Sequence, residues 1–278
     1  MAENSKISWC DHTFNCWVGC SKVSEACKHC YAEGWAKRTG QPNLWQGERR
    51  RTSAANWKLP LKWQKEAEAS GERARVFCAS LADVFEDHPA IQDEWRNDLF
   101  KLIAATPNLD WLLLTKRPEN AVAYLPWVDP HVFPAGGAEP WPNVWIGTTV
   151  ENQQRADERI PQLLSTPAAV RFLSCEPLLG PIDLTDIGWS GSISKQRGPR
   201  GAVQQQNCLS KYGIQWVIVG GESGPNFRPF DLDWARSLQK QCEAAGVAFH
   251  FKQHGGRTPD AGGCLLDGKE YKAYPKAA

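Results

Sequence analysis

Six short apolar runs, rich in β-branched residues, constrain the fold of this chain more than any other feature. Each run is followed by a polar turn and a helix-like stretch. The runs cover residues 75–79, 111–115, 144–148, 170–175, 216–219 and 247–251. Their hydrophobicity is continuous rather than alternating, which is typical of strands that are covered on both faces, as in a parallel sheet.

The segments between these runs predict helices. In 89–105, apolar side chains recur at helical spacing, and 232–245 ends in Ala-Gly, a usual helix stop. Residues 153–164 predict a further helix, while 7–17 predict a first strand and 31–38 the helix that follows it. Strand and helix alternating in this way indicate βα architecture.

A chain of 278 residues is long enough for one such domain with a sizeable core. We therefore predict a single α/β domain over 1–278, a partial TIM-type (βα)6 barrel with a mostly parallel sheet. Two segments look like inserted loops, at about 127–142 and 186–212, because they are rich in Gly together with Pro, Ser or Gln.

Cysteines are concentrated at the amino terminus, where five of the ten lie within the first thirty residues. No secretory leader precedes them, so a metal site in a reducing compartment is favoured over a disulfide framework. Cys20, Cys27 and Cys30 are spaced as C-x6-C-x2-C. Three thiolates can hold three irons of a 4Fe-4S cluster and leave the fourth iron open.

Two other interpretations of these cysteines stay open on spacing alone. Zinc would take the same three thiolates and a fourth ligand from His29, Cys16 or Cys10. Alternatively, some of the thiols are small buried hydrophobic side chains that hold no metal.

Charge and hydropathy exclude some classes of protein. Lys and Arg together number 32 and Asp and Glu 31, so no net field points to nucleic acid or a membrane. No apolar run approaches the roughly 18 residues of a membrane span, and we expect a soluble cytoplasmic protein. The basic runs 49–51 and 195–200 would serve nucleic-acid binding or simply lie in solvated loops.

Polar side chains follow the predicted strands at their carboxyl ends. In a βα barrel this edge carries the site, because the strands fix it while the loops vary. A mixture of carboxylates, cations and glycines near a metal suits a charged cofactor. The candidate cofactor-binding residues are Ser80, Asp83, Lys116, Arg117, Glu176, Gly220, Gly221 and Glu222.

Each of these candidates also has a purely structural interpretation. Gly220 and Gly221 would form a tight turn before a solvated Glu222. Lys116 and Arg117 would be exposed charges before a helix that begins at Pro118. Glu176 would belong to a turn.

A cysteine triplet after the first strand of a partial βα barrel, followed by an aromatic residue and a later GGE, resembles the radical S-adenosylmethionine superfamily. Five phrases resemble the phage-associated gene-product-37/gene-product-68 family of unknown function, over nearly the whole chain. They are SKISW at 5–9, GCSKVS at 19–24, CKHCYAE at 27–33, LTKRP at 114–118 and GGESG at 220–224.

The resemblance implies that Cys20, Cys27 and Cys30 bind the cluster, while Cys10 and Cys16 lie outside the family pattern. Two features depart from the usual superfamily pattern, which is C-x3-C-x2-C with GGE after the second strand. Glu222 therefore cannot be equated by position with the residue that holds the methionine ammonium, and Ser80 or Asp83 competes for that role.

The implied function is that of an iron-sulfur enzyme that reductively cleaves S-adenosylmethionine to abstract hydrogen from a substrate. The phage association favours a nucleotide or nucleic-acid substrate, and the chemistry requires a reductant such as flavodoxin or ferredoxin. The alternative is a zinc-stabilised module that binds DNA or protein without catalysis.

Overall fold

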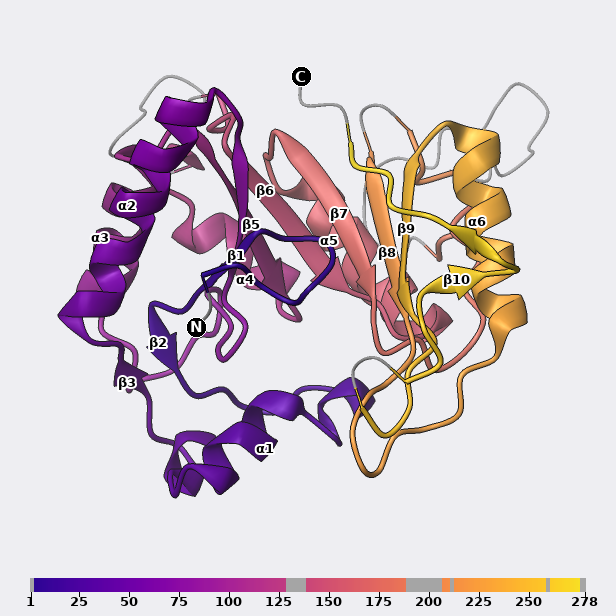
Figure 1. The fold of residues 1–278 in the computed structure, drawn as a ribbon, viewed down its shortest axis with the longest axis horizontal. Helices are drawn as coiled ribbons and strands as arrows, with labels where there is room; N and C mark the ends of the chain where they lie inside the picture. The colour runs from indigo at the N-terminus through magenta and orange to yellow at the C-terminus, as the bar shows by residue number, and fades with distance from the viewer. Residues whose placement is uncertain (1–2, 129–138, 189–206, 211–212, 259–260, 276–278) are drawn as a thin grey trace. The chain divides into compact units, whose positions relative to one another are not determined.

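A computed structural model describes residues 3–128, 139–188, 207–210, 213–258 and 261–275 (Figure 1). Most of the two predicted insertions, at about 127–142 and 186–212, and the basic run 195–200 lie outside the described residues. By its internal contacts the chain divides into two compact units. Unit 1 comprises residues 1–147 and 166–170, and unit 2 comprises 148–165 and 171–277.

Within the described residues, seven strands form the main sheet, and their hydrogen-bonded order follows the order of the chain. They are β1 (His12–Phe14), β4 (Ala74–Cys78), β5 (Leu109–Thr115), β6 (Val144–Thr149), β7 (Val170–Cys175), β8 (Trp216–Gly220) and β9 (Ala248–Gln253). Parallel neighbours in chain order, without a reversal, are the topology of barrel-like α/β folds rather than of doubly wound sheets. The predicted α/β class and mostly parallel sheet are confirmed.

The helices that separate these strands are α1 (Tyr31–Arg38), α2 (Ala54–Ser70), α3 (Asp93–Ala104), α4 (Pro118–Tyr124), α5 (Gln153–Ser165) and α6 (Leu232–Ala245). The seven strands correspond to the predicted first strand at 7–17 and the six later runs. The described residues between β7 and β8 contain no helix, and the finer assignment of a (βα)6 barrel stays a prediction. None of the described helices is long and apolar enough to cross a membrane.

The sheet of unit 1 is parallel, with His12 opposite Val76 and Cys78 opposite Leu113. Its core is aromatic: Phe14 and Trp111 pack edge to face with ring centroids 5.6 Å apart. A small antiparallel pair, β2 (Trp17–Val18) with β3 (Arg50–Arg51), and the 3₁₀ turns η1 (Glu25–Cys27), η2 (Pro42–Trp45) and η3 (Pro126–Val128) complete the unit.

Helix α2 of unit 1 was not predicted from the sequence. Its ends carry ordinary signals, because Ser53 accepts a hydrogen bond from the backbone N–H of Asn56 and Gly71 closes the helix at a φ of 73°. The buried positions do recur at helical spacing, but Asn56 and Gln64 occupy two of them and Pro60 a third. The helix therefore buries a stripe that is only partly apolar.

Unit 2 is built on the parallel strands β7, β8 and β9, with Phe172 opposite Trp216 and Trp216 opposite Ala248. Helix α6 packs on β8 and β9, as Figure 1 shows in yellow and orange. A hairpin of β10 (Leu265–Leu266) and β11 (Lys269–Glu270) follows. The carboxyl ends of the three strands therefore lie at one edge of this unit.

Candidate cysteine-loop site

The loop that carries the cysteines leaves β2 at Gly19, passes through η1 and ends at Cys30, the residue that caps α1. Gly19 has a φ of +116°, and a Cβ there would lie 2.6 Å from the Leu44 carbonyl oxygen. Only glycine fits this position without strain. Its N–H donates to the Leu81 carbonyl at 3.0 Å, which anchors the start of the loop beyond the end of β4.

Ser21, the residue after the first cysteine, is held through all three of its polar groups. Its N–H donates to Glu86 Oε1 at 2.9 Å, and its carbonyl oxygen accepts from Arg117 Nη2 at 2.8 Å. Its hydroxyl oxygen lies 2.7 Å from Arg49 Nη2, which donates to it. The backbone beside Cys20 is thus fixed from three directions.

The three groups that hold Ser21 belong to one buried network of charges. Arg49 donates to both oxygens of Glu86 at 2.7 and 2.8 Å. Arg117 contacts Asp83 at 3.0 Å and Glu86 at 3.3 Å. Every one of the four side chains is at most 9% exposed. Two guanidinium groups balance two carboxylates, so the network is neutral and each buried charge has a partner.

The network shifts the pKa values of Glu86 and Arg117. Burial raises the pKa of Glu86, but the hydrogen bond from Arg49 and the charges of Arg117 and Arg49 outweigh it and bring the pKa below 4.5. For Arg117, burial lowers the pKa, yet Asp83, Cys20 and Glu86 raise it above its ordinary value. Both groups therefore stay ionised in the folded chain at neutral pH.

Arg117 also reaches the sulfur of Cys20, with Nη1 3.7 Å from Sγ. Burial, followed by the charges of Asp83 and Glu86, raises the pKa of this thiol to about 12, against the opposing effect of Arg117. Cys20 is a protonated thiol at neutral pH without a bound cation. A metal that binds it must displace the proton.

A second anchor joins the ends of β1 and β4. The side chain of Asn15 donates to Ser80 Oγ at 3.0 Å and accepts from the Leu81 N–H at 2.6 Å. Tyr31, which follows Cys30, donates from its hydroxyl to the Ser80 carbonyl. Both ends of the cysteine loop are therefore tied to the residues that follow β4.

Four of the predicted cofactor-binding residues belong to this same region of unit 1. Asp83 accepts from Thr115 Oγ1 at 2.7 Å, from the Lys116 N–H at 3.0 Å and from Arg117. Ser80 is bound by Asn15. Lys116 is half-buried, and its ammonium forms no ion pair with a described residue. Of the four, Lys116 alone keeps its charged group available to a ligand.

The three candidate metal ligands share one loop but do not form a finished metal site. All three are free and half-buried. Across the part of the chain that the structure describes, no three His, Cys, Asp or Glu side chains are arranged to hold a metal ion. The donor chemistry of three thiolates fits an iron-sulfur cluster, although the structure does not gather the three sulfurs around one point.

The remaining predicted residues lie at the strand ends of unit 2, and each has a structural partner. Glu176 forms an ion pair with Lys252. Gly221 lies so close to the β9 end that a Cβ would fall 2.1 Å from the His254 carbonyl oxygen, while Gly220 has only ordinary contacts, the nearest at 3.5 Å. Glu222 Oε2 accepts at 2.9 Å from both the N–H and Nε of Arg228.

Comparison of the sequence with known proteins identifies one matching protein family. A family model described as "Protein of unknown function (DUF5131)" matches residues 4–275. The chain belongs to this DUF5131 family. No curated protein and no solved structure gave a significant match. The radical S-adenosylmethionine superfamily and the phage gene-product-37/gene-product-68 family gain no support from these comparisons.

The thiols of Cys10 and Cys16 of this DUF5131 chain contact residues outside the cysteine loop. Cys16 is fully buried, and its thiol contacts Cys78, whose pKa is raised by burial and further by Cys16. Cys10 is buried 3.5 Å from Ser5 Oγ. The structure therefore gives no sign of either residue as the fourth ligand of a zinc ion.

Sequence reasoning missed the residues that hold the loop. Asn15, Ser21, Arg49 and Glu86 were not candidates, although Asn15 directly follows a strand and Glu86 lies three residues after Asp83. The run 49–51 does not act as one basic patch. Arg49 is buried against Glu86, and Arg51 pairs with Asp98 at 2.7 Å and lies 4.4 Å from the Trp57 ring, so Arg50 alone is exposed.

Proposed function

We propose that this DUF5131 protein is an iron-sulfur enzyme that binds a 4Fe-4S cluster through Cys20, Cys27 and Cys30 and uses S-adenosylmethionine. One observation supports it above the others: the loop that carries the three thiols is held at the carboxyl ends of parallel strands by a buried ionic network. Each of the four buried charges costs several kcal/mol in desolvation before it is paired, so holding the loop in this way is energetically expensive. The partial TIM-type barrel is part of the same proposal.

In this proposal the reactive chemistry belongs to the 4Fe-4S cluster and S-adenosylmethionine, not to side chains of the protein. Cys20, Cys27 and Cys30 would hold the cluster, which would supply an iron free of protein ligands for S-adenosylmethionine and an electron for its cleavage. The protein would hold and orient the cluster and S-adenosylmethionine and shield them from water. Arg117 and Ser21 position Cys20, and Lys116 offers its ammonium to the carboxylate of the ligand.

The proposal changes the roles expected for several residues. Arg117 and Asp83 act as positioning residues for the loop, because their charged groups already bind each other. Glu222 and Glu176 are bound by Arg228 and Lys252, so we assign them to the stability of unit 2. Lys116 is the predicted cofactor-binding residue that we retain. A reductant such as flavodoxin or ferredoxin would deliver the electron, and the nucleotide or nucleic-acid substrate stays a prediction.

Anaerobic reconstitution with iron and sulfide tests the cluster. We expect brown protein with about four irons per chain, and loss of iron in Cys20→Ser, Cys27→Ser and Cys30→Ser. Cys264→Ser is the matched control, because Cys264 is also free and half-exposed but lies outside the loop. Colourless protein that retains one zinc would contradict the proposal and favour the zinc-stabilised binding module.

Electron paramagnetic resonance of the reduced protein, with and without S-adenosylmethionine, tests the cofactor. We expect the cluster signal to change when the cofactor is added. Lys116→Gln should keep the iron content and weaken this change, because the variant loses only the cation. A signal that never responds to S-adenosylmethionine would leave an iron-sulfur protein of another kind.

A further inference from the structure

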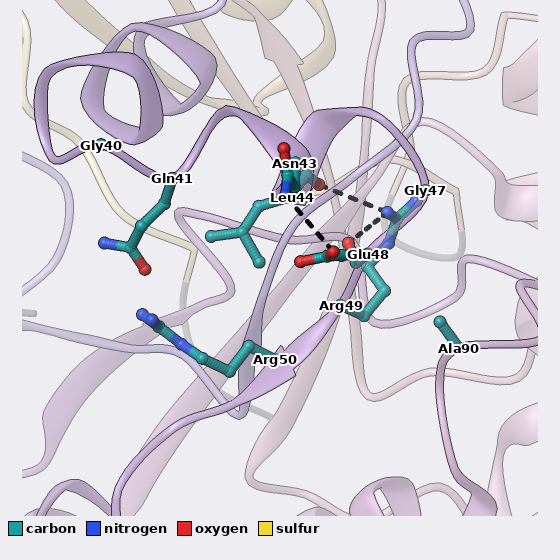
Figure 2. A pocket seen from close by; sticks show the side chains of 9 residues that line it. All are labelled: Gly40, Gln41, Asn43, Leu44, Gly47, Glu48, Arg49, Arg50 and Ala90. Carbon is teal, nitrogen blue, oxygen red and sulfur yellow. Dashed lines mark hydrogen bonds between the residues drawn. The ribbon is translucent and has the colours of Figure 1, made fainter.

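Unit 1 contains a cavity of about 480 Å³ that the proposed function does not use. Figure 2 shows it between the turn that ends α1 and the segment that leads into β3. Its lining includes the side chains of Gln41, Leu44, Glu48, Arg49 and Arg50. A cavity of this size lies within the range of small-molecule sites.

Arg49 forms one wall of the cavity. Its side chain is held in place by hydrogen bonds, and its positive charge is already balanced by a carboxylate. Arg49 donates to the carbonyl oxygens of Leu44 at 3.3 Å and Glu48 at 2.7 Å, in addition to its ion pair with Glu86. Leu44 is buried and supplies an apolar surface. Arg49 therefore shapes the cavity, while its charge is not available to a ligand.

Gln41 presents an unused acceptor. Its Nε2 donates to Thr39 Oγ1 at 3.0 Å. The hydroxyl of Thr39 is directed at the carbonyls of Trp35 and Ala36, so its oxygen can accept and the orientation of the Gln41 amide is fixed. Gln41 Oε1 is buried and has no hydrogen-bond partner among the residues that the structure describes. Leaving a buried acceptor without a hydrogen bond costs free energy, and a donor group on a bound ligand would remove this cost.

Opposite charges lie at the same cavity. Arg50 is exposed and forms no ion pair with a described residue, and Glu48 is exposed and accepts only a long bond of 3.4 Å from Asn43. A guanidinium binds a carboxylate through two parallel bonds, whereas an ammonium has several N–H groups to share between a carboxylate and an amide oxygen. The lining thus matches a molecule that carries both an ammonium and a carboxylate.

We propose that this cavity binds a free α-amino acid. The carboxylate of the amino acid pairs with Arg50, and its ammonium donates to Gln41 Oε1 and Glu48. The side chain of the amino acid lies toward Leu44. The cavity borders the buried network, because Arg49 lines it and also donates to Ser21 and Glu86. The groups proposed to bind the amino acid, on Arg50, Gln41 and Glu48, are not part of that network.

Titration of the full, metal-free chain with individual L-amino acids, followed by ¹H–¹⁵N correlation spectra, tests the proposal. We expect saturable shifts of the Gly40 and Gly47 amides, which line the cavity. L-Alanine, propionate and ethylamine form a matched set, since the last two each lack one charged group. Binding by both fragments as strong as by the amino acid, or no saturable shift with any amino acid, would overturn the site.

Two variants test the contact to the carboxylate and the contact to the ammonium separately. Arg50→Gln and Gln41→Leu should each weaken binding by about tenfold or more, as expected for the loss of one charged or buried hydrogen bond. Arg38→Gln is the control, because Arg38 is an exposed arginine of α1 outside the lining. Unchanged affinity in Arg50→Gln would also overturn the proposal. Because the protein is metal-free, failure here leaves the cluster proposal untouched, and the reverse also holds.

Discussion

The guanidinium of Arg117 donates to the backbone carbonyl of Ser21 at 2.8 Å, although 96 residues separate the two in the chain. The same group lies 3.7 Å from the sulfur of Cys20. A residue at the end of β5 therefore fixes the first cysteine of the loop from a distance. Two buried carboxylates, Asp83 and Glu86, hold the guanidinium in turn, so the loop position depends on the whole network.

Substitution of Arg117 by Met should destabilise the fold strongly. Asp83 would lose its ion-pair partner and Glu86 one of two, and an uncompensated buried charge costs about 3–5 kcal/mol. Urea denaturation followed by circular dichroism measures the free energy of unfolding. Arg236→Met is the control, because Arg236 pairs with Asp233 and Asp267 in solvent and should change it little. Equal effects of the two substitutions would show that the buried network is not required.

The strands of the sheet were predictable because their side chains are buried on both faces. The prediction for β7 matches its bounds, and those for β4 and β8 differ by one residue at their ends. Helix α2 was not predictable from hydrophobic periodicity, because its buried face includes Asn56 and Gln64, whose polar groups bond to Asn15 and Asn108. Those partners belong to other elements, and periodicity carries no information about them.

In the candidate site, too, local sequence pattern identified some residues, whereas contacts between distant segments were not predictable. Asp83 and Arg117 were found because they follow strands in the sequence. The clamp on Ser21 was not, because it depends on Arg49 and Glu86 meeting across 37 residues. The GGE motif suggested a ligand, whereas its second glycine is explained by the approach of the His254 carbonyl, which no local pattern reveals.

His12 should make stability depend on pH. Its ring stacks on Trp63 at 4.2 Å, and burial lowers its pKa below 6.5, against the charges of Asp11, Glu66 and Glu3. The unfolded chain therefore binds the proton more readily than the folded one. The stability due to neutral His12 is full above pH 6.5 and is lost as the pH falls toward the pKa of the folded state.

His12→Phe keeps an aromatic ring beside Trp63 and removes the titration. We expect the variant to lose part of the decrease in unfolding free energy that the wild type shows just below pH 6.5. Urea denaturation over a pH series measures the slope, and an NMR titration of the His12 ring gives its pKa directly. A His12 pKa above 6.5 would reverse the expected sign.

The two glycines of the GGE motif should differ in their tolerance of alanine. A Cβ at Gly221 would overlap the His254 carbonyl, and such overpacking costs about 1–3 kcal/mol. Gly220→Ala adds a methyl group at ordinary contact distance and should change the free energy of unfolding much less. Thermal denaturation of the two variants makes the comparison. Equal stability in both would mean that the backbone there yields easily, and would reopen a ligand-binding role for the motif.

Cys10 and Cys16 should not be required for iron binding. Cys16 contacts Cys78 inside unit 1 and Cys10 lies beside Ser5, so neither thiol is placed to complete a site with Cys20. We expect Cys10→Ala and Cys16→Ala to retain the iron and sulfide content of the reconstituted wild type, while Cys20→Ala loses it. Iron analysis after gel filtration provides the measurement, with the unfolding curve of each apo variant as a check on folding. Loss of iron in a folded Cys16→Ala variant would place a fourth thiolate on the metal, and a closed four-ligand site leaves no position for S-adenosylmethionine.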